Sequence, residues 1–126
     1  MGSVKRYGVV HLLPLSDSPR FAGDRQSILS HALYDAEQYQ RGGFHGLIIE
    51  NFGDAPFFKE EVSAATIAEM TWLATHIAQQ LKGELEIGIN VLRNDAAAAL
   101  AIAHAVDADF IRVNVHCGSM FTDQGL

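Results

Sequence analysis

Short apolar segments typical of β-strands alternate along this chain with longer segments that have the apolar spacing of helices. The strand-like segments are rich in Val, Ile and Phe, and turn residues flank most of them; they are Tyr7–Leu13, Gly46–Asn51, Ile87–Leu92 and Phe110–Val115. Because strands that alternate with helices are joined by right-handed crossovers, neighbouring strands are expected to run parallel. The pattern therefore predicts an α/β fold of order βαβαβαβ.

The three expected helices begin and end at recognisable residues. Each starts after a side chain that can cap a helix N-terminus: Asp24, Ser63, and either Asn94 or Asp95. Gly42-Gly43 closes the first helix, and Gly83 lies just past the second. The third is the alanine-rich stretch Asp95–Val106. Each has apolar residues at a spacing that lets one side pack on a sheet.

Composition narrows the class of protein. With 126 residues, of which 48% are hydrophobic and 19% charged, the chain has the size and composition of one globular domain. The formal net charge of −6 argues against nucleic-acid binding, and no apolar stretch is long enough to span a bilayer. The single cysteine, Cys117, rules out an internal disulfide framework and is typical of a reducing compartment. We therefore expect a cytoplasmic protein without a nucleic-acid partner, for which peripheral association with a membrane stays open.

Two architectures accommodate four parallel strands. One is an open four-stranded sheet, and the other is half of a (β/α)8 barrel, because a complete barrel needs about 250 residues. The chain stops at Thr122–Leu126, after the fourth strand and its loop. A half barrel leaves strand edges unpaired, and such edges promote association. We therefore expect either a homo-oligomer, in which two halves close one eight-stranded ring, or a second half that follows Leu126.

Polar side chains gather toward the C-terminal ends of the expected strands. Strand side chains alternate between two faces, and one face of each strand is apolar. The other face carries polar residues near the strand end: His11, Glu50, Asn90, and Arg112 with Asn114. Parallel strands bring these ends to one edge of the sheet, where ligand sites of α/β sheets and barrels form. The sequence therefore predicts a binding site at this edge.

Glu50 and Arg112 are the best candidate pair. A carboxylate can act as an acid, a base or a metal ligand, and a guanidinium beside it can hold an anion. The alternative is a buried ion pair that fills the barrel interior. His11 is equally open, as a proton carrier or as a hydrogen-bonded core residue. A metal site made by His11, Glu50 and His116 is disfavoured, because no compact ligand motif supports it.

Further candidates lie in the loops that follow the strands. The run Leu92–Asp95 places a cation and a cap where a helix begins, which is either an anion site or ordinary capping. The loop Asn51–Val62, which contains Asp54, is long for a connection between a strand and a helix and favours a functional lid or wall. No dinucleotide-binding fingerprint and no P-loop occur in the sequence.

Several longer motifs, in order along the chain, resemble those of one family. They are Val10–Leu15 with Ser18–Arg20, Ile49–Phe57, Gly88–Ala96, and Phe110–His116 with Thr122–Gly125. Together they span nearly the whole chain, which is similar to the BtpA/SgcQ family. The resemblance implies a TIM-barrel-like fold. The family takes its name from a cyanobacterial factor needed for photosystem I biogenesis, and SgcQ-type members are associated with sugar-metabolism genes.

The chain departs from the family pattern at two positions and in length. Asp17 stands where members tend to have Gly, and Cys117 stands where Thr is common. Family members also continue beyond Leu126 into a second half. Residues 1–126 are therefore expected to form the N-terminal half of such a barrel, a (βα)4 parallel half of a TIM-like (β/α)8 fold.

The expected function is that of a small-molecule enzyme or binder for an anionic ligand, either a phosphorylated sugar or a nucleotide-like molecule. An enzyme of this kind would use lyase- or hydrolase-type acid–base chemistry, with His11, Glu50 and Arg112 as catalytic residues. The expected substrate-binding residues are Asn51, Asp54, Asn90, Arg93, Asn94, Asp95, Asn114 and His116. No metal is predicted, and the cofactor is left open. The alternative is a non-catalytic assembly or stability factor for a membrane protein complex.

Overall fold

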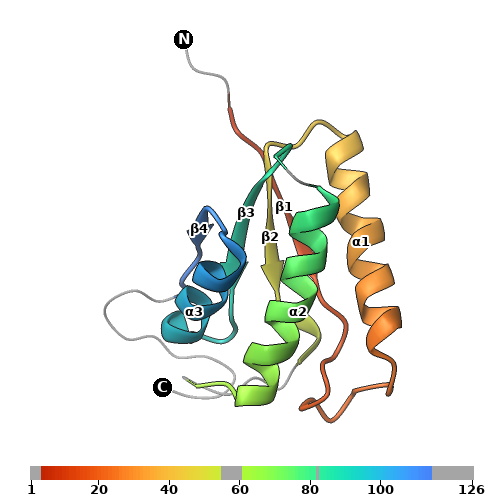
Figure 1. Cartoon of the computed structure of the whole chain (residues 1–126), viewed down its shortest axis with the longest axis vertical. Helices are drawn as coiled ribbons and strands as arrows, with labels where there is room; N and C mark the ends of the chain where they lie inside the picture. The colour runs from red at the N-terminus through yellow and green to blue at the C-terminus, as the bar shows by residue number, and fades with distance from the viewer. Residues whose placement is uncertain (1–3, 55–60, 82, 115–126) are drawn as a thin grey trace.

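The computed structural model describes residues 4–54, 61–81 and 83–114 as a four-stranded parallel sheet with three α-helices packed against it (Figure 1). The strands are β1 (Tyr7–His11), β2 (Gly46–Glu50), β3 (Glu86–Asn90) and β4 (Phe110–Ile111). The helices are α1 (Arg25–Arg41), α2 (Ala64–Gln80) and α3 (Ala96–Val106), and a short 3₁₀ turn, η1 (Phe52–Asp54), follows β2.

The strands lie side by side in chain order, β1-β2-β3-β4. Right-handed crossovers between strands in this order place every connecting helix on the same face of the sheet. A doubly wound sheet, with helices on both faces, needs a reversal of the strand order that is absent from the described strands. The predicted α/β fold, half of a TIM-like barrel, is thereby confirmed.

The helices begin at the predicted caps. The Asp24 carboxylate accepts hydrogen bonds from the backbone N–H groups of Gln26 and Ser27, and the Ser63 hydroxyl accepts one from Thr66. Asp95, rather than Asn94, caps α3 by accepting from the Ala98 N–H at 2.9 Å. None of the helices in the described ranges is both long and apolar enough to cross a membrane.

One face of the sheet packs under the helices, as the alternation predicts. Val10, Leu47, Ile49 and Ile89 are fully buried there, and they share one core with helix residues such as Ile28, Met70, Leu73, Ile77 and Ile102. Burial of each large side chain stabilises the fold by about 1.5–3 kcal/mol. The residues that alternate with them along the strands, such as Val9 and Glu50, project from the opposite face, which none of the described helices covers.

The strands are shorter than predicted. β1, β2 and β3 end at His11, Glu50 and Asn90, one or two residues before the predicted ends, because the chain turns there into loops that hydrogen-bond outside the ladder. The Gly53 N–H, for example, donates to the Leu12 carbonyl at 3.0 Å. β4 is confined to Phe110–Ile111 instead of Phe110–Val115, and Val115 lies outside the described residues.

Two aromatic rings fill the N-terminal part of the uncovered face, a feature that the sequence did not predict. Tyr7 of β1 and Phe110 of β4 meet edge to face, with ring centroids 5.4 Å apart. They lie over Gly46 and Gly88 of the two inner strands, where a Cβ atom on Gly46 would come within 2.6 Å of the Tyr7 ring. A Cβ atom on Gly88 would lie still closer to Phe110. We call these four residues the ring layer. Glycine at positions 46 and 88 leaves the space that the two rings occupy.

We predict that Gly88→Ala destabilises the protein by about 1–3 kcal/mol, the usual effect of inserting atoms into a packed interior. The added methyl group overlaps the Phe110 ring, so either the ring or the strand must move. Urea denaturation measures the loss. The double variant Gly88→Ala, Phe110→Leu should be less destabilised than the sum of the two single variants. Strict additivity of the two changes would contradict the proposed overlap.

Candidate functional site

Parallel pairing sets four polar residues in a row across the C-terminal ends of the strands. His11 pairs with Glu50, and Glu50 with Asn90, in the register of the sheet. The Arg112 N–H donates to the Ile89 carbonyl at 2.9 Å, which continues the row just past β4. We call His11, Glu50, Asn90 and Arg112 the strand-end row.

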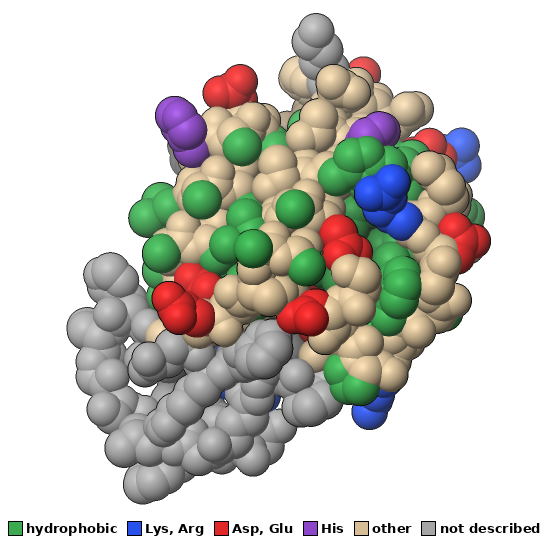
Figure 2. Space-filling view, turned by 60° about the horizontal axis from the view of Figure 1, so that its bottom comes forward, with side chains coloured by type: hydrophobic (Ala, Val, Ile, Leu, Met, Phe, Trp, Pro, Cys, Tyr) green, Lys and Arg blue, Asp and Glu red, His purple; other side chains and the backbone are tan. Residues whose placement is uncertain are grey.

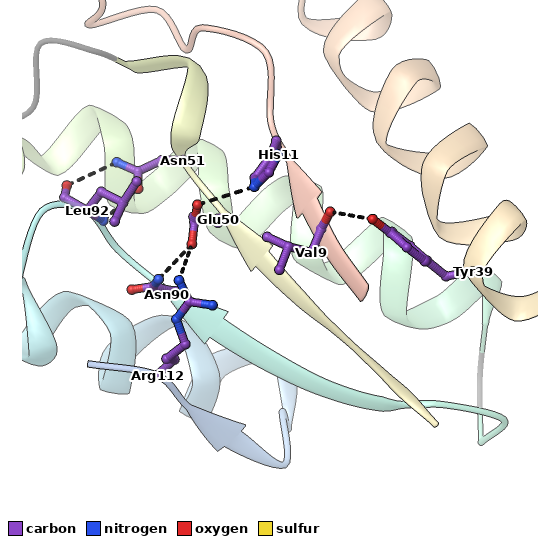
Figure 3. Close-up of polar contacts among 8 residues, drawn as sticks. All are labelled: Val9, His11, Tyr39, Glu50, Asn51, Asn90, Leu92 and Arg112. Carbon is purple, nitrogen blue, oxygen red and sulfur yellow. Dashed lines mark hydrogen bonds and ion pairs between the residues drawn. The ribbon is translucent and has the colours of Figure 1, made fainter. Parts of the chain in front are cut away.

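The members of the strand-end row converge on the Glu50 carboxylate (Figure 3). Asn90 Nδ2 and Arg112 Nη2 both donate to Glu50 Oε2, at 2.7 Å and 3.1 Å. On the other side, His11 Nε2 lies 3.5 Å from Glu50 Oε1. The two carboxylate oxygens therefore face different partners, an amide with a cation on one side and an imidazole on the other.

The burial of these side chains is uneven. The Glu50 side chain is 4% exposed, whereas those of Arg112 and His11 are 46% and 52% exposed. Removing a carboxylate from water is costly unless hydrogen bonds and an opposite charge compensate it. Asn90 and Arg112 provide that compensation. Glu50 is thus fixed at the floor of the site, and its two ionisable neighbours can still meet a ligand.

His11 also contacts an aromatic ring at the rim of the site. The Phe52 ring of η1 lies 4.6 Å from the His11 ring, centroid to centroid, with the planes tilted by 33°. Phe52 is 54% exposed. The sequence alone does not indicate a role for Phe52, because one aromatic residue after a strand carries no periodic or motif signal.

Asn51, predicted to bind substrate, fastens the loop after β3 to the end of β2 (Figure 3). Its Oδ1 accepts from the Leu92 N–H at 2.6 Å, and its Nδ2 donates to the Leu92 carbonyl at 3.2 Å. The residue is 1% exposed. Both groups of the Asn51 side chain are therefore engaged by the protein backbone.

Asp54 and Asp95, also predicted to bind substrate, hold loops as well. Asp54 Oδ1 accepts from the Leu15 N–H at 2.8 Å, which ties η1 to the loop after β1. Asp95 caps α3 with one oxygen and accepts from the Val62 N–H at 2.8 Å with the other. These contacts with the backbone are sufficient to explain why Asp54 and Asp95 occupy their positions, and no ligand is needed for that explanation. Their contact with a substrate remains a prediction.

The pKa of Asp54 is raised above its ordinary value of 3.8, chiefly because the carboxylate is partly buried. The hydrogen bonds from Leu15 and Asn51 act in the opposite direction, and the nearby charges of Glu69 and Asp17 add to the rise. Asp54 therefore holds its proton more tightly in the folded protein than in an unfolded chain.

Three more of the predicted residues, Arg93, Asn94 and Asn114, lie in the described part of the chain. Arg93 and Asn94 are partly buried, and both interact with other groups of the protein. Asn114 is exposed, two residues beyond Arg112. His116 lies outside the described residues, so its predicted place in the site is untested. The structure thus brings together His11, Glu50, Asn90 and Arg112 of the predicted set.

Metal binding was disfavoured from the sequence. Among the residues that the structure describes, no group of three or more His, Cys, Asp or Glu side chains is arranged to hold a metal ion. Figure 2 shows the molecule with the bottom of Figure 1 turned forward, and on that side acidic and basic side chains are interspersed with hydrophobic ones.

The strand-end row can act on a ligand in two ways. An imidazole next to a buried carboxylate is an arrangement that can accept and return a proton. A half-exposed guanidinium presents several N–H donors in a fixed fork and binds carboxylate or phosphate groups well. The arrangement is therefore suited to an anionic ligand with hydroxyl groups.

Relatives of the chain are found among archaea and cyanobacteria. Residues 5–126 match the sequence model of the BtpA family. An uncharacterized protein of Pyrococcus abyssi is 48% identical over 126 residues, which is 100% of this chain and 48% of that protein. The photosystem I biogenesis protein BtpA of Synechocystis is 49% identical over 119 residues, 94% of this chain and 41% of that protein. The chain spans about half the length of the curated relatives it matches. No solved structure matches it significantly.

The raised pKa of Asp54 predicts a pH dependence of stability. Because the folded state binds this proton more tightly, the stability of the folded state falls as pH rises from 3.8 through the raised pKa of Asp54. Asp54→Asn cannot ionise and still accepts from the Leu15 N–H. The stability of the variant relative to the parent should therefore increase as pH rises through this window. Urea denaturation at a series of pH values measures the difference.

Asp24→Asn is the matched control, because hydrogen bonds from Ser27 hold the pKa of Asp24 below its ordinary value of 3.8. Its contribution to stability is present above that value and is lost as pH falls through the lowered pKa. The control should thus respond to pH in the opposite direction from Asp54→Asn. Parallel pH profiles for the parent and Asp54→Asn would contradict the assignment.

Proposed function

This chain belongs to the BtpA family, and from that premise we propose that its strand-end row binds a small anionic ligand, either a phosphorylated sugar or a nucleotide-like molecule. The observation that carries the proposal is the buried Glu50 carboxylate, held by Asn90 and Arg112 and flanked by the half-exposed His11. Sites of α/β barrels form at this end of the strands.

A purely structural ion pair is the competing explanation of these contacts. Exposure of either charge to water weakens such an ion pair, so a half-exposed pair contributes little to the stability of the fold. Here the carboxylate is enclosed, but Arg112 and His11 are each about half exposed. A pair that served only the fold would not need a second ionisable group on its open side. The uneven burial therefore favours a binding site.

The proposed roles follow from the contacts of each side chain. Arg112, anchored through Glu50, presents its remaining N–H groups to an anion. His11 and Glu50 exchange a proton with the bound molecule, as an acid–base pair does in a lyase or hydrolase. Asn90 holds the carboxylate in place from within the sheet. A cytoplasmic location is part of the proposal, supported by the single cysteine.

A second candidate function is a role in the assembly of a membrane protein complex. It is favoured by the relative from Synechocystis that is named a photosystem I biogenesis protein and is 49% identical to this chain over 119 residues. An assembly factor would depend on its outer surface, and substitutions in the strand-end row would leave it functional. A ligand-binding site predicts the reverse.

We predict that Arg112→Leu weakens the binding of ribose 5-phosphate about tenfold, because charge-assisted hydrogen bonds contribute roughly 1.5–3 kcal/mol. Isothermal titration calorimetry measures the affinity. Arg41→Leu, which removes an exposed cation at the end of α1, is the matched control and should bind as the parent does. Arg112→Lys separates charge from geometry, since lysine keeps the charge beside Glu50 but lacks the fork of donors.

Equal affinities of the parent and the correctly folded Arg112→Leu variant would contradict the proposed site. Failure of the parent to bind ribose 5-phosphate at all would remove the phosphorylated sugar from the proposal. Circular dichroism of each variant establishes that the fold is retained, which matters because the change leaves Glu50 without its cation.

We further propose that the outer strands pair with additional strands, from a second copy of the chain or from the second half of a barrel. β1 and β4 each have one neighbouring strand within the described sheet. Unpaired edges are satisfied by further strands, and a twofold arrangement closes both at once. Light scattering of the 126-residue chain should give at least twice its mass of 13.7 kDa. A stable monomer would contradict the pairing of two copies.

A further inference from the structure

An exposed aromatic ring adjoins the strand-end row. The described residues include four large hydrophobic side chains with high exposure, Val4, Tyr34, Phe52 and Leu100. Of these, Phe52 is the first residue of η1, two positions after Glu50 at the end of β2. It contacts the row through the His11 ring, at 4.6 Å between centroids. Exposure of an aromatic ring beside polar groups is typical of a binding surface.

The position of Phe52 is fixed by its neighbours. The Gly53 N–H donates to the Leu12 carbonyl at 3.0 Å, and the Asp54 N–H donates to the Asn51 carbonyl at 3.1 Å. The Asp54 carboxylate also accepts from the Leu15 N–H at 2.8 Å. The 3₁₀ turn is therefore tied to the loop after β1 at its middle residue, Gly53, and at its last residue, Asp54. A ring held in this way loses little conformational entropy when a ligand stacks on it.

The site consequently has two chemically different ends. The Phe52 and His11 rings lie at the β1 end, and the Arg112 guanidinium reaches Glu50 from the β4 end. Glu50 and Asn90 lie between them with hydrogen-bonding groups. A molecule that matches this order has a flat ring, a middle part with hydroxyl groups and an anion. A phosphorylated sugar alone has no group for the aromatic end.

We propose that Phe52, backed by His11, is a stacking surface for the base of a nucleoside monophosphate whose phosphate group lies at Arg112. The inference rests on the proposed function and narrows its ligand to the nucleotide-like class. Stacking on an aromatic side chain tolerates any base, because every base has a π-face. Phe52 thus determines the preference for a nucleotide over a sugar phosphate, whereas Arg112 determines the affinity for the phosphate group.

Adenosine monophosphate and ribose 5-phosphate are matched probes, since they share a phosphorylated ribose and differ by the base. Isothermal titration calorimetry with the full chain should show that the parent binds the nucleotide about tenfold more tightly. Phe52→Ala should lose this preference and bind both probes with the affinity that the parent has for ribose 5-phosphate. Phe52→Tyr, which keeps the ring, should retain the preference. Tyr34→Ala removes a ring that is 63% exposed on α1 and should change neither affinity.

Two results would overturn the inference. One is a parent that binds both probes equally well, which leaves the anion site in place and removes the stacking surface. The other is a Phe52→Ala variant that keeps the full preference for the nucleotide. If the parent binds neither probe, the proposed function and the inference both fail. Thermal unfolding of each variant checks that the chain is folded. Because Phe52 is exposed, its replacement is expected to change the unfolding temperature only slightly.

Discussion

In-register parallel pairing of the strands is the constraint on which both the core and the site depend. The row that contains Val10, Ile49 and Ile89 lies beneath the helices, and the next row along the strands contains His11, Glu50 and Asn90 on the opposite face. Because strand side chains alternate, a slip of one residue would exchange the two faces. Glu50 would then lie among aliphatic side chains without Arg112, and the cost of an uncompensated charge there is severe. The hydrophobic core therefore specifies the geometry of the polar site.

The loops around that site are held by side chains that bond to backbone groups of distant segments. Asn51 joins the end of β2 to Leu92, Asp54 joins η1 to Leu15, and Asp95 joins α3 to Val62. Loops lack the regular ladder of a sheet, so their backbone N–H groups need such partners when they are shielded from water. Polar residues near a binding site can thus serve its shape without touching a ligand.

The strand-end row was predictable because it follows from two local regularities, the alternation of strand side chains and the alignment of parallel strand ends. The distant partners of Asn51, Asp54 and Asp95 were not, since a polar residue in a loop reveals nothing about which amide of another segment will lie across from it. The space that Gly88 leaves for an aromatic ring was also invisible, because it depends on the meeting of β3 with β4. The roles of the row in binding and catalysis stay predictions, which contacts within the protein do not test.

The ring layer and the strand-end row divide the uncovered face into two parts with different tolerance to sequence change. At the ring layer, Tyr7 and Phe110 occupy the volume that any side chain at Gly46 or Gly88 would need. Glycine is therefore almost the only amino acid that fits at these two positions. At the rim, half-exposed groups can be exchanged without displacing packed atoms. Substitutions at the rim can therefore change which ligand the site binds while the ring layer stays the same. Changes in what the site recognises are therefore expected at the strand-end row, because the packing around Gly46 and Gly88 leaves no space for new side chains.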